Sequence, residues 1–332
     1  GPLTAQEILP PAPTQNALAG ADVFGEKGCI RCHLSGVGES LGPDLGSVES
    51  ARTFSDLTAA LWNHLPDMSR QMADLGIERP RLTDREAGDL YAYLHTLRYF
   101  DAGGDAVRGR QLFTELSCIR CHQVEGVGGV VGPVLDHVGA RGAPIEVAAA
   151  IWNHGPAMIE AAEVEGIERP RMSGAQLADL IAFLQSTDAR TPADNMYVLP
   201  GDAAAGARVI QEQNCSQCHG NPGSGGGMAP DLAGLTRGVS LFEFVALMWN
   251  KSSQMAAALR GRNIEFPHLE AEDFANIVAY LYSVDYFSYG GRASSGRMLI
   301  DSKGCGKCHT ARDLSSVPGM DHPSAVTAAL WN

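Results

Sequence analysis

Apolar residues recur at helical spacing in three widely separated stretches of the chain. Leu90, Tyr93 and Leu94 form the first stretch, and the equivalents are Leu180, Phe183 and Leu184, then Ile277, Tyr280 and Leu281. Thr83-Asp84-Arg85-Glu86 and Ser173-Gly174-Ala175-Gln176 precede the first two stretches and have the form of capping boxes, which mark helix starts. The pattern predicts a closing helix near the end of each of three repeats.

A shorter opening helix is predicted at about Gly20 to Lys27 and at the equivalent positions. A glycine and, four residues later, a large apolar residue recur there: Gly20 and Phe24, Gly109 and Phe113, Gly206 and Ile210, Gly296 and Ile300. The glycine would let the closing helix cross close by, with its aromatic residue packed beside Phe24 or the equivalent. No run of alternating strands appears, so we predict an all-α chain of small tandem domains.

The segment between the two helices repeats as well. A glycine-rich loop ends in Gly42-Pro43-Asp44-Leu45, Gly132-Pro133-Val134-Leu135 or Ala229-Pro230-Asp231-Leu232. A Trp-Asn pair, predicted on a loop, begins 17 residues after each of those leucines; a methionine lies six past each Trp, and a proline 12 past each Met. This internal repetition predicts three complete domains and part of a fourth.

Domain limits follow from the repeats and from the composition between them. Residues 1–17 contain several prolines and few large apolar side chains, which predicts an extended arm. We expect domains at 18–102, 103–190, 205–288 and, incomplete, 289–332, with 191–204 as a linker. Tyr99-Phe100 and Tyr286-Phe287 lie in similar linkers, near 97–107 and 284–294. We therefore infer that a unit of two domains was duplicated.

The eight cysteines all belong to one motif, C-x-x-C-H, which occurs four times. Two thiols at this spacing can bond one haem covalently, and the adjacent histidine can bind its iron. The cysteines are Cys29, Cys32, Cys118, Cys121, Cys215, Cys218, Cys305 and Cys308, and the histidines are His33, His122, His219 and His309. The sequence thus predicts four covalently bound c-type haems. A redox dithiol, a zinc site and disulfides are the weaker alternatives, because none of them needs the repeated histidine.

Charge and hydropathy limit the kinds of partner and the cellular location that fit the chain. The formal net charge is −13, which argues against nucleic acid and suits either simple solubility or a partner with a basic patch. No apolar run approaches the length of a transmembrane span; Leu241 to Trp249 is among the longest. Covalent haem attachment takes place outside the cytoplasm, so we expect a periplasmic or extracellular protein whose leader was removed. Gly1-Pro2 also fits a protease scar, and a lost anchor stays open.

The motifs and the repeat together resemble tandem class I cytochrome c domains over nearly all of the chain after residue 17. The resemblance implies an all-α fold around each haem and electron transfer as the activity. It also implies a proline-bearing loop that supports the ligand histidine, and a methionine on a later loop as the sixth iron ligand.

The identity of that sixth ligand can be weighed from the repeats. His64 and His154 follow the first two Trp-Asn pairs, but Lys251 takes their place in the third. Methionine is kept in all three, so we predict Met68, Met158 and Met255 as ligands, with Met72 as a competitor in the first domain and core packing as the alternative role.

Other polar side chains have weaker assignments. We expect surface or structural roles for His64, His154, His95, His137, His268 and His322. Indole N–H groups of Trp62, Trp152 and Trp249 are candidates to donate to haem propionates. For Arg79, Arg81, Arg169 and Arg171 a solvated loop is favoured over a propionate contact.

The fourth repeat departs from the others. Its loop after His309 is shorter, and Arg312 stands where the others have proline. Leu314 and Trp331 are again 17 residues apart, but Ile300 would lack its packing partner. We expect a longer natural chain; otherwise Met320, His322, a partner's side chain or a small molecule must complete the fourth site.

These observations favour a tetrahaem carrier that passes single electrons between redox partner proteins, including membrane respiratory or photosynthetic complexes. Catalysis is the less favoured outcome. The alternatives are a haem enzyme or the cytochrome subunit of an oxidoreductase with an open site at haem 4, and a subunit of a polymeric or membrane-associated electron conduit.

Overall fold

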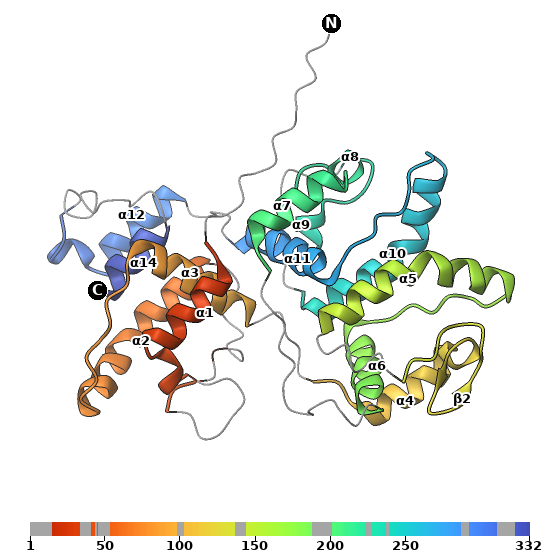
Figure 1. The fold of residues 1–332 in the computed structure, drawn as a ribbon. Helices are drawn as coiled ribbons and strands as arrows, with labels where there is room; N and C mark the ends of the chain where they lie inside the picture. Colours follow the sequence, from red (N-terminus) through yellow and green to blue (C-terminus); the bar gives the residue numbers. More distant parts are fainter. Residues whose placement is uncertain are drawn as a thin grey trace, which may run out of the picture. The chain divides into compact units, whose positions relative to one another are not determined.

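The computed structural model describes residues 15–33, 41–43, 45, 54–97, 103–136, 144–187, 201–222, 227–236, 239–286, 292–310 and 323–332 (Figure 1). The chain divides into two compact units. One contains the second and third repeats within Arg98–Tyr282, and the other joins the first repeat, within Ala12–Leu97, to the fourth, within Ser283–Asn332. The domains therefore pair as second with third and first with fourth. A duplicated two-domain unit would instead suggest first with second and third with fourth.

Each repeat begins with the predicted opening helix. These helices are α1 (Ala17–Glu26), α4 (Ala106–Glu115), α7 (Ala203–Glu212) and α12 (Ala293–Ser302). In the first three, the side chain of Asn16, Asp105 or Asp202 caps the helix by accepting from a main-chain N–H of the first turn. These caps set the helix start three residues before the glycine in each case.

A long middle helix carries the Trp-Asn pair in each complete repeat. These helices are α2 (Phe54–Asp74), α5 (Pro144–Val164) and α10 (Leu241–Arg260). The prediction that the Trp-Asn pair lies on a loop is therefore wrong. Leu57, Leu61 and Leu65 recur every fourth residue and pack against buried core residues, which favours helix. Pro66 and Pro156 lie inside α2 and α5; each removes one helical hydrogen bond and is tolerated within a helix that tertiary packing stabilises.

The closing helices are α3 (Asp84–Thr96), α6 (Gly174–Ser186) and α11 (Ala271–Tyr286). Both predicted capping boxes are present, from Thr83 to Glu86 and from Ser173 to Gln176. In the fourth repeat, α14 (Pro323–Trp331) packs against α3 and α2 of the first.

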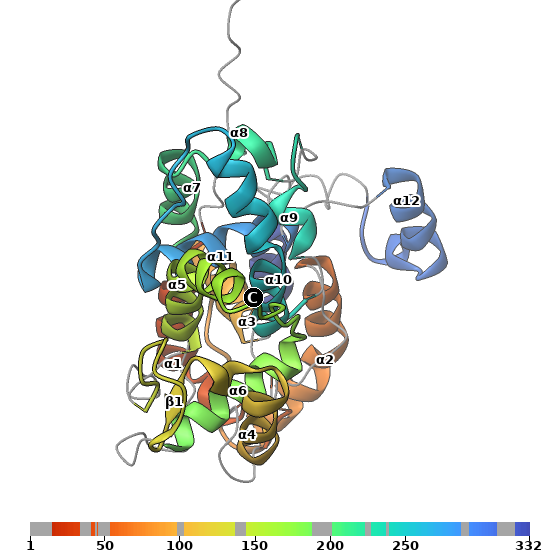
Figure 2. The ribbon, with the colours of Figure 1, turned by 90° about the vertical axis from the view of Figure 1, so that its right-hand side faces the viewer.

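The predicted crossing of opening and closing helices is confirmed. A Cβ added to Gly20, Gly109 or Gly206 would overlap the main-chain carbonyl of Asp89, Asp179 or Asn276. Phe24 packs on Tyr93 with ring centroids 5.4 Å apart, and Phe113 packs on Phe183 at 5.7 Å. Figures 1 and 2 show α4 beside α6 in both views, in agreement with their contacts.

The fourth repeat lacks this crossing among the described residues. A Cβ on Gly296 would meet nothing within 4 Å, and Ile300 is 39% exposed. Met298 and Leu299 on the same helix are exposed as well. The expectation that Ile300 has no packing partner is confirmed for the described part of the chain.

Short elements complete the all-α domains. The haem motifs form η1 (Cys29–Arg31), η3 (Cys118–Arg120), α8 (Ser216–His219) and η5 (Cys305–Lys307), and α9 (Leu232–Leu235) follows the third. A two-stranded antiparallel hairpin, β1 (Gln123–Val124) and β2 (Val127–Gly128), follows the second motif.

Candidate haem-binding sites

The four C-x-x-C-H motifs adopt the same tight helical turn. The residue before each first cysteine is left-handed, with φ of 76° at Gly28, 64° at Ser117, 56° at Asn214 and 71° at Gly304. The histidine N–H then donates to the carbonyl of the first cysteine, at 3.0 Å for His33. The turn therefore holds two thiols and one imidazole together, as attachment to a single porphyrin requires.

The ligand histidine is oriented by the proline-bearing loop in each complete repeat. The Nδ1 atom of His33 lies 2.9 Å from the carbonyl oxygen of Pro43; His122 and Pro133 are 3.0 Å apart, and His219 and Pro230 are 2.8 Å apart. A carbonyl can only accept, so Nδ1 carries the proton and donates. The Nε2 lone pair is left free for a metal, as in the usual arrangement of a metal-bound histidine.

The loop lies directly against the imidazole. A Cβ on Gly42 would come within 2.7 Å of the His33 ring, and the Gly42 N–H donates to the Cys32 carbonyl at 2.9 Å. In the third repeat Ala229 makes the same main-chain bond to Cys218 at 2.9 Å. This close approach fixes the loop, and thereby the imidazole, relative to the thiol pair.

The thiols are also placed as a porphyrin requires. No disulfide joins any two of the eight cysteines, all of which lie among the described residues, so the disulfide alternative is not supported. Burial raises the pKa of Cys29, and it raises the pKa of Cys118 and of Cys215 to about 11. The first thiol of each of the first three pairs is thus withdrawn from water, which suits a porphyrin edge, and the residues present there fit a c-type haem.

A second histidine lies across from the ligand histidine in the first two repeats. The ring centroids of His33 and His64 are 6.3 Å apart, and those of His122 and His154 are 6.4 Å apart. Partial burial, and then the nearby His122, lower the pKa of His154. Sequence reasoning assigned His64 and His154 to surface or structural roles, because Lys251 breaks their pattern.

The predicted methionine ligands lie one helical turn further along. Met68, Met158 and Met255 are half-buried on α2, α5 and α10. Met68 packs against the core cluster that contains Phe24 and Leu90. Ligation by these three methionines stays a prediction, and so does the role of Met72 as a competing ligand in the first domain.

The fourth motif is the most open of the four. Cys308 and His309 are exposed on and after η5, although the His309 N–H still donates to Cys305 at 3.0 Å. Met320 and His322, the candidates to complete this site, lie outside the described residues, as does His137. The first-domain His95 is half-buried, and His268 is exposed beside Glu270.

Two of the three tryptophans proposed as donors to propionates have other partners, and for Trp62 the role stays a prediction. The indole N–H of Trp152 donates to the carbonyl of Pro267 at 2.9 Å, and that of Trp249 donates to Pro170 at 2.9 Å. In the other unit Trp331 donates to Pro80 at 2.6 Å, whereas Trp62 is 57% exposed. Three of the four indoles therefore bind the neighbouring repeat, and the proposed donation to propionates is wrong for Trp152 and Trp249.

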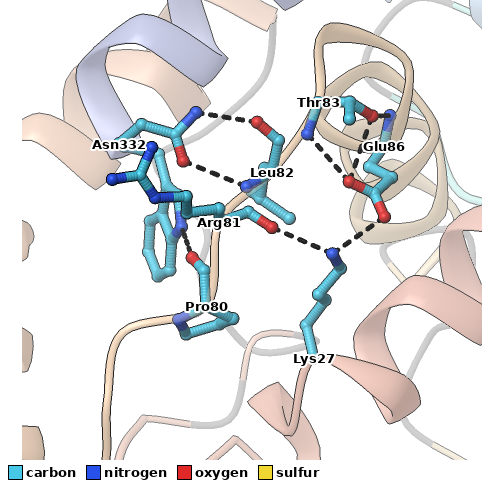
Figure 3. Close-up of polar contacts among 8 residues, drawn as sticks. Lys27, Pro80, Arg81, Leu82, Thr83, Glu86 and Asn332 are labelled. Carbon is cyan, nitrogen blue, oxygen red and sulfur yellow. Dashed lines mark hydrogen bonds and ion pairs between the residues drawn. The ribbon is translucent and has the colours of Figure 1, made fainter.

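The asparagine after each of these three tryptophans strengthens the same contact. Asn153 pairs with Leu269, Asn250 with Met172, and Asn332 with Leu82, each through two hydrogen bonds between the side-chain amide and the main chain. Figure 3 shows the pair of Asn332 and Leu82. Sequence reasoning found both halves of this contact, the Trp-Asn pair and the Pro-x-Leu/Met segment, but did not join them. We call each such set of Trp and Asn contacts a clasp.

A further repeated contact was missed. The side chain of Asp89, Asp179 or Asn276 on the closing helix accepts from the main-chain N–H of Asn16, Asp105 or Asp202 at 2.7 Å. The sequence signal is a short polar residue four positions before the aromatic of each closing helix. It ties the start of the opening helix to the closing helix.

The arginines beside the clasps have mixed surroundings. Arg169 stacks on the Trp249 ring, 3.6 Å from its centroid, and burial lowers the pKa of Arg169 to about 10. It lines a cavity of about 270 Å³ with Arg171 and Lys251. Arg79 donates to the carbonyl of Asn332 at 3.1 Å. The expected solvated loop is therefore wrong for Arg169, while Arg171 and Arg81 are exposed.

The described part of the chain holds no group of three or more His, Cys, Asp or Glu residues placed to bind a metal ion. Within the same residues, no helix combines the length and apolar character needed to cross a bilayer.

Comparison with known proteins agrees with this geometry. A family model described as cytochrome c matches residues 17–98, 106–188 and 203–285. No curated protein and no solved structure matches the chain.

Proposed function

Because the chain belongs to the cytochrome c family, we propose that it is a tetrahaem protein that passes single electrons between redox partners outside the cytoplasm. The family model matches three domains, and its haem electron-transfer chemistry applies to each. The observation that carries the proposal is the hydrogen bond from the ligand histidine to a proline carbonyl in all three complete repeats. A fourth haem is supported by the turn at Cys305–Lys307 and its bond to His309.

The residues of each domain have distinct parts in this function. A bound c-type haem supplies an iron that alternates between two oxidation states. The two cysteines fix the haem covalently, and the histidine binds the iron through Nε2, in the tautomer that the proline carbonyl imposes. Packed helices limit the access of water and, with the axial ligands, set the potential. No proton transfer by a side chain is required.

The count of haems is the first test. The chain, matured by an export and haem-attachment pathway, should show an intact mass and a pyridine-haemochrome absorbance of four haems per polypeptide. The double variant Cys305→Ala/Cys308→Ala should hold three. A wild-type protein with three haems would reject the fourth site, and one without haem would reject the whole proposal.

Location and partners form the second part of the proposal. The expected location is periplasmic or extracellular, and fractionation of native cells with haem staining tests it. The net charge of −13 supports a partner with a basic surface, such as a soluble or membrane-bound respiratory or photosynthetic complex. Electron exchange with such a partner should slow as ionic strength rises.

An open fourth site is a second candidate function, because Cys308 and His309 are exposed. A haem enzyme or an oxidoreductase subunit would bind cyanide or carbon monoxide at this iron, with a change in the visible spectrum. Four low-spin, six-coordinate haems that do not change would favour the carrier.

A subunit of an electron conduit is the third candidate. It is favoured by the exposed apolar face of α12, where Met298 is 65% and Leu299 is 55% exposed. Particle size measured over a dilution series would reveal assembly through this face. A protein that stays monomeric at every concentration would reject the conduit and favour the electron carrier.

A further inference from the structure

The middle helices of the first two repeats place a second imidazole at a repeated distance from the haem-binding histidine. His64 on α2 and His33 have ring centroids 6.3 Å apart, with their planes inclined by 66°. His154 on α5 and His122 are 6.4 Å apart, inclined by 58°. The two repeats lie in different compact units, so the arrangement occurs twice independently.

This separation matches two imidazoles on opposite sides of one metal ion. A metal–nitrogen bond of about 2.0 Å and a further 1.2 Å or so from the nitrogen to its ring centre place the centroids about 6.4 Å apart. Two imidazoles joined by a direct hydrogen bond would have centroids only about 5.3 Å apart, since their nitrogen atoms would be about 2.9 Å apart. The observed distances thus leave room for one iron between the rings.

An edge-to-face ring contact covers the same range of distances, so orientation matters as well. The Nδ1 atoms of His33 and His122 are held by Pro43 and Pro133 at 2.9 and 3.0 Å. The Nε2 atom of each ring is therefore turned away from the loop and is free to bind a metal.

The methionines compete for the same place at a disadvantage. Met68 and Met158 follow His64 and His154 by four residues, which is about 6 Å along a helix axis. One helix position cannot present both side chains to the same iron without a shift of a whole turn. Met68 already packs beside Phe24 and Leu90 in the core of its unit.

We infer that His64 and His154 are the sixth ligands of the first two haems, in place of the predicted Met68 and Met158. The inference rests on the proposed function, because it requires a haem at both motifs. The third repeat has the exposed Lys251 at this position, so Met255 remains the sixth ligand there.

Unequal ligands order the haems by potential. A methionine ligand raises the potential of a haem iron relative to a second histidine. The first two haems are therefore the weaker oxidants, and within the unit of the second and third repeats an electron would move energetically downhill from the second haem to the third. The chain holds an internal direction of flow that identical domains would lack.

Full-length, haem-loaded protein tests the ligands by spectroscopy. The variants Met68→Leu and Met158→Leu keep the apolar volume, which favours retained folding. Each variant should leave unchanged the near-infrared absorption that reports iron–thioether bonds. Met255→Leu should remove the part of that absorption that one haem contributes. The variants His64→Leu and His154→Leu should each remove one bis-histidine low-spin signal from the electron paramagnetic resonance spectrum.

The opposite outcome is clear in the same samples. The inference would be overturned if Met68→Leu or Met158→Leu lost the thioether absorption of one haem. In that case His64→Leu and His154→Leu would leave the low-spin signals intact. That result, with four haems still present by pyridine haemochrome, would leave the proposed function standing. Absence of haem would instead reject the proposed function itself.

Discussion

The side-chain amide of Asn153 is paired with the main chain of Leu269 by two hydrogen bonds. The Nδ2 group donates to the Leu269 carbonyl at 2.7 Å, and the Leu269 N–H donates to Oδ1 at 2.9 Å. Asn250 and Met172 repeat the arrangement in the opposite direction, at 2.7 and 3.0 Å. The second and third domains are thus joined reciprocally, each by a helix of the other.

Asn153→Ala should destabilise this unit. The substitution leaves the N–H and carbonyl of Leu269 without their partners in a part-buried contact, at a cost of about 2 kcal/mol in the free energy of unfolding. Chemical denaturation followed by circular dichroism measures the change. Asn63→Ala is the matched control, because Asn63 holds the same position in the first repeat and is exposed. An equal loss of stability in both variants would contradict the role of the clasp.

Two equivalent glycines should respond to alanine with opposite signs. At Gly109 a Cβ would overlap the Asp179 carbonyl and lie 2.7 Å from the Phe183 Cβ, so Gly109→Ala should cost about 2 to 3 kcal/mol. Gly296 has nothing within 4 Å, so Gly296→Ala should gain up to about 1 kcal/mol from helix propensity alone. Thermal unfolding of the two variants beside the wild type tests the difference. A neutral Gly109→Ala would mean that α4 and α6 can separate without loss.

The ion pair between Lys27 and Glu86 should make stability depend on pH. The hydrogen bond from Lys27, and then that from the Thr83 main chain, lower the pKa of Glu86 below its ordinary value of 4.5. Because the pKa is lower in the folded protein, the stabilisation is present above the unfolded pKa and is lost as pH falls through the folded one. In Glu86→Gln the fall in Tm between about pH 6 and pH 3 should be smaller.

Glutamine at position 86 leaves the helix cap in place. Gln176 forms the same capping box with Ser173 in the second repeat, so Glu86→Gln removes charge and keeps the cap. The comparison therefore isolates the carboxylate. An acid-induced fall in Tm as steep in Glu86→Gln as in the wild type would assign the pH dependence to other groups.

Arg169 should contribute to the clasp of Trp249 through ring stacking. Its guanidinium carbon lies 3.6 Å from the indole centroid, a cation–π contact on a part-buried side chain. Arg169→Ala should lower the free energy of unfolding by about 1 to 2 kcal/mol. Arg171→Ala, on the other side of Pro170 and exposed, should change it by less than about 0.5 kcal/mol. Denaturant titration of both variants gives the comparison.

Local signals were sufficient for much of each domain. The capping residues Thr83 and Ser173, the glycine at position 20 and its equivalents, and the C-x-x-C-H turns all act over short stretches or through one steric contact. Their structures were therefore predictable from spacing. The middle helix was missed, although Leu57, Leu61 and Leu65 recur at helical spacing and their packing outweighs the one hydrogen bond that Pro66 removes.

Contacts between repeats were not predictable from one chain. The Trp152 and Pro267 partners are separated by 115 residues, and spacing within a repeat cannot say which repeat supplies the partner. The same limit explains why the pairing of the first domain with the fourth was missed. For the sixth ligand, Lys251 made methionine the more regular pattern, while only the ring distances of His64 and His154 indicated histidine.

The clasps bear on how fast charge can hop between neighbouring cofactors. Asn153 directly precedes His154 on α5, and Asn250 lies five residues before Met255 on α10. The amides that join the second and third domains are therefore built into the helices that carry the residues proposed as sixth ligands. Tunnelling falls steeply with the gap to be crossed, and a reciprocal joint holds that gap constant. Transfer between these two irons needs no collision or hinge motion, in contrast to exchange with a freely diffusing partner.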